Sequence, residues 1–142
     1  MIEKLYNIQD VKRKFKEVEN EKNKVCAPLL CDFDMIPTIY KWFLDFFAER
    51  NCPPNPASVY QRKKFIFIVL YIFAPSVLLG DKMPVGLRDR IWAALYKTAD
   101  KSVISHNCED LLFYFTHYTD FKKDVEDVFD HIKRRLNEEG IV

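Results

Sequence analysis

Short polar side chains at the start of an expected helix are the residues of this chain best suited to recognition chemistry. The stretch ADKSVISHNCED begins as a polar turn, and Ser102, Ser105, His106 and Asn107 follow within two helical turns. Their hydroxyl, imidazole and amide groups donate and accept hydrogen bonds, so such a surface could read base edges in a major groove. Solvated polar residues in a helix's first turns give the same pattern, and this alternative stays open.

Basic residues precede that stretch and could contact phosphate groups. Residues 58–101 carry eight Lys/Arg and three Asp/Glu, a net charge of +5, whereas the whole chain carries only +1. A local excess of this kind can attract nucleic acid even when the total charge is near zero. We expect the following residues to hold phosphates: Arg62, Lys63, Arg88, Arg90, Lys97 and Lys101. Arg62 and Lys63 belong with Lys64 to a basic trio at the expected exposed beginning of a helix, and a solvated helix end explains that trio equally well.

Apolar residues recur at helical spacing along most of the chain and predict the elements that position these groups. The chain has 142 residues, enough for one domain, and its three glycines are too few for phosphate loops or many tight hairpins. We therefore predict an all-α fold, a single compact domain of about five to six helices over residues 25–142. The expected helices cover residues 2–24, 37–50, 58–74, 87–98, 102–119 and 121–138. The apolar helix 58–74 is expected at the centre.

The expected caps at the starts of these helices are Asp34 for helix 37–50, Ser102 or alternatively Asp100 for helix 102–119, and Thr119 or Asp120 for the last helix, which Gly140 is expected to end. The expected buried face of helix 37–50 holds Ile36, Ile39, Tyr40, Phe43 and Phe47.

Residues 1–24 are predicted to form a separate, charged amphipathic helix. Its apolar residues make one stripe, because they recur at intervals of three and four: Leu5, Ile8, Val11, Phe15 and Val18. The rest of its surface is rich in lysine and glutamate. We expect this helix either to project from the core or to pair with a second copy of itself.

The segment RIWAALYKTADKSVISHN resembles the helix-turn-helix of bacterial and phage DNA-binding proteins. In that family an "IA..L" helix, here Ile91, Ala93 or Ala94, and Leu95, meets an "S..(V/I)S" recognition helix, here Ser102, Ile104 and Ser105. The layout is also loosely similar to the DNA-binding domain of the replication initiator DnaA. The similarity covers residues 87–119, and it departs from the pattern by lacking a glycine in the turn.

What the resemblance implies is a DNA-binding protein, sequence-specific or architectural, such as a transcriptional regulator of a phage or mobile element. Double-stranded DNA would be the partner, with the first helix crossing the phosphate backbone and the second entering the major groove. Many proteins of this class are homodimers. Glu109 and Asp110, only two turns into the second helix, would repel phosphates unless they are turned away or paired.

Metal and enzyme chemistry are poorly supported by the residue pattern. Cys26 and Cys31 form a Cx4C pair, and Cys52 lies in a proline-rich loop, but the second half of a zinc knuckle is missing. His106, His117 and His131 have no evident nucleophile or carboxylate pair at a useful spacing. We expect free thiols, no metal, no cofactor and no catalytic activity.

The rival interpretation is a non-enzymatic interaction or structural protein. Aromatic residues make up 15% of the chain, and the stretches IYKWFLDFF and FIFIVLYIF could supply more apolar surface than one small core hides. The surplus would form a homo-oligomer or bind another protein. The apolar run Phe65 to Phe73 is too short to span a membrane, which needs about 20 residues. Because the first residues are charged throughout, we expect a cytoplasmic protein without a membrane partner.

Overall fold

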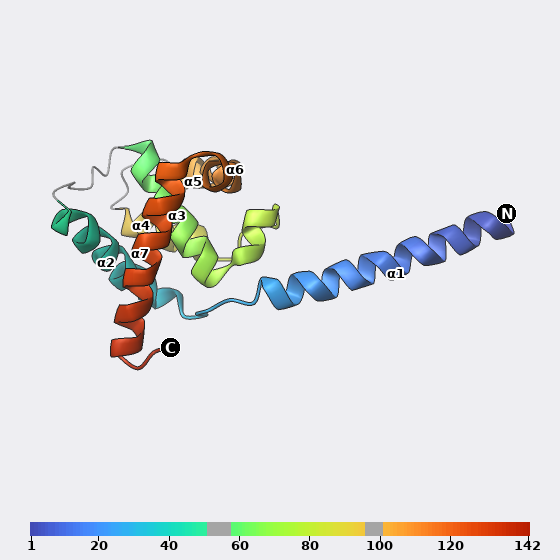
Figure 1. Cartoon of the computed structure of the whole chain (residues 1–142), viewed down its shortest axis with the longest axis horizontal. Coiled ribbons are helices and arrows are strands. Elements are labelled where there is room, and N and C mark those ends of the chain that lie inside the picture. Colours follow the sequence, from blue (N-terminus) through green and yellow to red (C-terminus); the bar gives the residue numbers. More distant parts are fainter. Residues whose placement is uncertain (51–57, 96–100) are drawn as a thin grey trace.

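The computed structural model describes residues 1–50, 58–95 and 101–142 and is helical throughout (Figure 1). Its α-helices are α1 (Ile2–Val25), α2 (Ile36–Glu49), α3 (Val59–Phe73), α4 (Leu87–Ala94), α5 (Lys101–Asn107), α6 (Leu111–His117) and α7 (Thr119–Glu138). Two 3-10 turns join them, η1 (Phe33–Met35) and η2 (Pro75–Leu79). No described residue lies in a strand, and the predicted all-α fold with a compact helical body is confirmed.

Helix α3 lies at the centre of the body, as predicted. Ser58 caps it, because its hydroxyl accepts a hydrogen bond from the backbone N–H of Gln61 at 3.4 Å. Every residue from 62 to 70 is buried, and Phe65, Ile66 and Leu70 are completely so. Apolar side chains all around a helix require neighbours on every side, and α2, α7, α5 and η2 supply them.

Helices α2 and α7 bury the faces that their periodicity predicts. In α2 the expected residues are all buried, namely Ile36, Ile39, Tyr40, Phe43 and Phe47. The predicted cap of this helix, Asp34, is wrong: Asp34 lies within η1, and α2 has no side-chain cap. Asp32 accepts a hydrogen bond from the Asp34 backbone N–H at 2.9 Å and caps η1. Helix α2 then continues directly from η1.

Helix α7 begins at Thr119 and has no side-chain cap on its first turn, so the predicted capping role of Thr119 or Asp120 is wrong. The predicted end at Gly140 is confirmed. Gly140 has a φ of 70°, and the backbone N–H of Ile141 donates to the Leu136 carbonyl at 3.0 Å. A left-handed residue of this kind closes the last turn of a helix.

The predicted single helix over residues 102–119 is wrong, because the chain turns at residues 108–110 between α5 and α6. The backbone N–H of Cys108 donates to the carbonyl of Ser105, and that of Glu109 to the carbonyl of His106, which is the tighter three-residue pattern of a helix end. Ile104 and Leu111 are both buried, so the apolar stripe continues across the break. Periodicity alone therefore could not reveal it.

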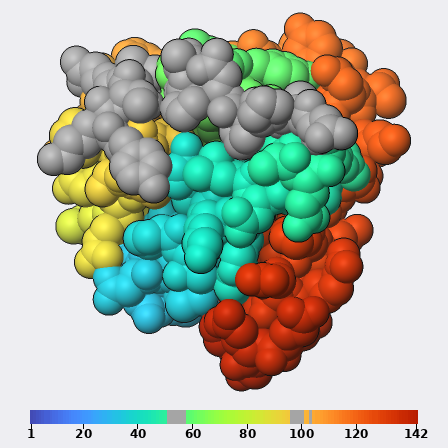
Figure 2. Space-filling model, turned by 90° about the vertical axis from the view of Figure 1, so that its left-hand side faces the viewer, coloured from blue at the N-terminus to red at the C-terminus, as the bar shows by residue number. Residues whose placement is uncertain are grey.

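Helix α1 extends away from the body, and none of its residues is buried (Figure 1). A connecting segment that contains Pro28 joins it to η1. Its attachment to the body includes an ion pair between Lys22 Nζ and Asp81 Oδ2 at 2.7 Å. Figure 2 views the body from the side opposite α1, and there α2 lies against the C-terminal part of α7.

Phe121 tests the assembly of this core, because it joins α7 to α3 and α6. It is fully buried, and its ring contacts those of Phe67, Tyr60 and Tyr114 at centroid distances of 5.7 to 5.9 Å. Phe121→Ala should lower the free energy of unfolding by about 3–5 kcal/mol, measured by urea denaturation. The control Phe113→Ala removes a ring that is 51% exposed on α6, so its effect should be below about 1 kcal/mol. Equal losses in the two variants would contradict this assignment of the core.

Candidate nucleic-acid interface

Helices α4 and α5 pack against each other and form the described part of the predicted helix-turn-helix. Leu87, Ile91 and Leu95 are buried on one face of the first segment, and Ile104 is buried on the second. The predicted phosphate contact Lys97 and the alternative cap Asp100 lie outside the described residues. Helix α5 begins at Lys101, so the predicted N-cap Ser102 lies inside its first turn.

Three of the predicted contact residues are exposed on two helices that pack against each other: Arg88 on α4, and Ser105 and His106 on α5. The Arg88 guanidinium donates to the Ser105 hydroxyl at 3.4 Å. Both side chains line a hollow of about 550 Å³, which Asp81, Lys82 and Asp89 also border. Two carboxylates stand beside two cations at its rim, so the hollow carries no net positive charge from these groups.

Two further predicted phosphate ligands are already paired with carboxylates. Lys101 Nζ lies 3.0 Å from Asp89 Oδ1 and 4.7 Å from the centre of the Trp92 ring. The Arg90 guanidinium forms an ion pair with Asp34, which precedes α2. A phosphate would have to displace these carboxylates, although both pairs are solvent-exposed and weak.

The basic trio at the start of α3 was predicted to be exposed, and this is wrong. Arg62, Lys63 and Lys64 are only 8%, 7% and 4% exposed. Lys63 Nζ donates to Asp110 Oδ2 at 2.9 Å and lies 4.0 Å from the centre of the Tyr114 ring. Because helices on several sides cover α3, neither Arg62 nor Lys63 offers a free surface for phosphate.

Asn107 was predicted to contact bases or to be solvated, and both expectations conflict with its burial. It is 8% exposed, and its amide nitrogen has no hydrogen-bond partner among the described residues. The reason is the turn at residues 108–110, which directs the last turn of α5 toward the body. The exposed part of the predicted recognition surface is therefore smaller than the sequence suggests.

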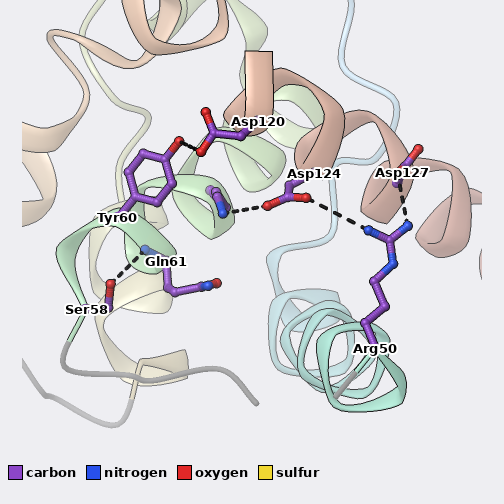
Figure 3. A network of polar contacts seen from close by, with 8 residues as sticks. Arg50, Ser58, Tyr60, Gln61, Asp120, Asp124 and Asp127 are labelled. Atoms are coloured by element: carbon purple, nitrogen blue, oxygen red, sulfur yellow. Dashed lines mark hydrogen bonds and ion pairs between the residues drawn. The ribbon is translucent and has the colours of Figure 1, made fainter. Parts of the chain in front are cut away.

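A row of acidic residues on α7 forms the polar network that holds the body together (Figure 3). Lys64 Nζ donates to Asp124 Oδ2 at 2.7 Å, and Arg50 at the end of α2 donates to Asp127 Oδ2 at 3.0 Å. The Tyr60 hydroxyl donates to Asp120 Oδ2 at 2.9 Å. Burial and this acidic neighbour raise the pKa of Tyr60. Sequence reasoning missed the network, although its signal was present: acidic residues at positions 120, 124 and 127 line one side of a helix.

The cysteines and histidines do not gather into a site within the described residues. Cys26 and Cys31 are free thiols, Cys52 lies in the undescribed loop, and the described chain contains no group of three or more metal-ligating side chains. Cys108 donates to the Ile104 carbonyl, and burial raises the pKa of its thiol to about 11. A thiol that stays protonated at neutral pH is a poor nucleophile.

His117 and His131 both pack against aromatic rings. The His117 ring stacks on Phe113 with centroids 4.0 Å apart, and its Nδ1 lies 3.1 Å from the Phe113 carbonyl oxygen. His131 lies 5.5 Å from the Phe46 ring, and burial lowers its pKa. These contacts give both histidines a packing role on the surface of the body.

Among the described residues, no helix has both the length and the apolar character that crossing a bilayer requires. No protein-family model, curated protein or solved structure matches the chain.

Lys64 provides a direct test of the buried network. Lys64→Met keeps the length of the side chain but leaves the Asp124 carboxylate without its closest cation. Because Asp124 is only partly buried and keeps Arg50 at 3.9 Å, we expect a loss of about 1–3 kcal/mol in the free energy of unfolding. Lys123→Met, at an exposed position one residue before Asp124, is the matched control and should change stability by less than about 0.5 kcal/mol. Urea denaturation monitored by far-UV circular dichroism measures both, and an unaffected Lys64→Met variant would show that the pair does not stabilise the fold.

Proposed function

We propose that the protein is a non-enzymatic interaction protein that self-associates through α1, with the helical body carried at one end of that helix. The observation that carries this proposal is the apolar stripe of α1, which the body leaves uncovered. The five stripe residues are between 50% and 72% exposed: Leu5, Ile8, Val11, Phe15 and Val18. The helix has 24 residues, and none of them is buried.

The stripe is apolar without interruption from Leu5 to Val18. Full burial of one valine, leucine or phenylalanine side chain stabilises a complex by about 1.5–3 kcal/mol, so five such residues form a substantial driving force. The opposite face of α1 is polar and exposed to solvent. Asp10 bonds Arg13 at 2.6 Å and Lys14 at 3.0 Å, and Arg13 lies 3.8 Å from Glu17. These pairs at intervals of three and four residues support the helix and keep its outer face polar.

Burial of the basic trio also favours an interaction role over a nucleic-acid one. Lys63 and Lys64 each have an acidic partner inside the body, and Lys101 and Arg90 have one at its surface. Three of these partners, Asp110, Asp124 and Asp34, lie outside residues 58–101 and offset three of the five net positive charges of that segment.

Substitutions in the stripe test this proposal. Val11→Asp with Phe15→Asp places two carboxylates in the contact surface and should convert an associated protein to a monomer, as measured by sedimentation velocity over a range of concentrations. The matched control, Asn20→Asp with Asn23→Asp, adds the same charge on the outer face of the same helix and should leave association unchanged. A wild-type protein that is monomeric at all concentrations would refute the proposal.

A second candidate, binding of duplex DNA, is favoured by the exposure of Arg88, Ser105 and His106 and by the hollow that Arg88 and Ser105 line. This candidate predicts salt-sensitive binding in fluorescence anisotropy of a labelled duplex, because phosphate contacts release counterions. Arg88→Ala should then weaken binding and reduce the slope of log affinity against log salt by about one. Lys41→Ala, at an exposed position on α2, is the control. Folded protein that binds no duplex at low salt would exclude this candidate.

A further inference from the structure

We propose that α1 pairs with α1 of a second copy in antiparallel orientation, in the register that places Phe15 opposite Val18 of the other copy. This inference rests on the proposed self-association and specifies its geometry. The apolar spacing, the charges beside it and the position of the body all favour this geometry.

The spacing of the apolar residues suits the seam of a coiled coil. From Ile8 onward the intervals are three, four and three residues, through Val11 and Phe15 to Val18, and they continue as four and three through Lys22 to Val25. Two helices that bury a repeat of this kind interlock their side chains along its length. In the proposed register, Ile8 lies opposite Val25 of the second copy, and Val11 lies opposite Lys22.

The residues flanking the seam carry charges that select the orientation. Lys12 and Glu19 occupy equivalent positions on one side of the seam, and Lys14 and Glu21 occupy equivalent positions on the other. In an antiparallel pair, equivalent flanking positions face each other. Lys12 therefore lies opposite Glu19 of the second copy, and Lys14 lies opposite Glu21. The two-fold axis repeats both contacts, so four pairs of opposite charge line the interface.

A parallel pair would use these charges less well. It would retain the contact between Lys14 and Glu19, but Lys12 would face Asn7 and Glu21 would face Cys26. It would also place the two copies of Lys22 directly opposite each other inside the seam. The antiparallel register instead lays the aliphatic part of Lys22 along Val11 of the second copy, while its ammonium group stays 2.7 Å from Asp81 of its own body.

The shape of the molecule is compatible with this orientation. The body lies beyond the C-terminal end of α1, and the helix extends freely from it (Figure 1). An antiparallel pair places the two bodies at opposite ends of the paired helices, apart from each other. Leu5, at the margin of the seam, then falls opposite Cys26 of the second copy and extends the apolar contact.

Two charge variants distinguish the two orientations. In the antiparallel pair, Lys12→Glu brings like charges together at two equivalent contacts and should weaken dimerisation about tenfold in buffer of low ionic strength. Adding Glu19→Lys to the same chain restores opposite charges there, and the double variant should dimerise within about twofold of wild type. Sedimentation equilibrium measures the dissociation constants, and far-UV circular dichroism checks that helicity is retained.

A parallel pair predicts the reverse order of effects. Lys12→Glu would then leave dimerisation unchanged, because its neighbour is Asn7, while the double variant would be weaker, because Lys14 would meet the introduced lysine. That outcome, with Val11→Asp/Phe15→Asp still monomeric, would overturn the antiparallel register and leave self-association through α1 intact. A monomeric wild-type protein would overturn both proposals.

Discussion

The side chain of Lys64 is only 4% exposed, and its ammonium group lies 2.7 Å from the carboxylate of Asp124. This pair determines how α3 meets α7. A charge on a buried helix is costly unless an opposite charge accompanies it into the interior. Helix α7 supplies the negative charge from the row of aspartates along one of its faces. The same row reaches Arg50 of α2 through Asp127, so one set of carboxylates holds three helices. The aromatic core, with Phe121 at its centre, packs among the helices that these ion pairs join.

The residues that are shielded from water were predictable, because burial of one face of a helix imposes a helical period on the apolar residues of the sequence. Ile36 and Phe43 of α2, and Val125 and Ile132 of α7, lie on the faces that this period indicates. The same reasoning failed over residues 102–119. An apolar stripe continues through the turn there, and the long-range pair between Lys63 and Asp110 lies at the break. A contact between residues 47 positions apart leaves no trace in local periodicity.

The candidate site was less predictable than the fold, because a list of charges does not show which of them are paired. Lys101 and Arg90 look like free cations in the sequence, but Asp89 and Asp34 accompany them in the structure. Asn107 looks like a surface amide in the sequence, but it lies at the end of α5, where it is buried against the body. The stripe of α1 was predictable from local periodicity, because none of its residues is buried by the body.

The contact between α3 and α7 has a consequence for the order in which the chain acquires its structure. Residues 59–73 leave the ribosome well before residues 119–138, and Lys63 and Lys64 of α3 pair with two carboxylates of later segments, Asp110 and Asp124. Until residues 119–138 have been synthesised, the apolar helix α3 has no cover from α7. The body therefore folds after translation of its last helix, whereas α1, which relies on its own ion pairs, can become helical as it emerges.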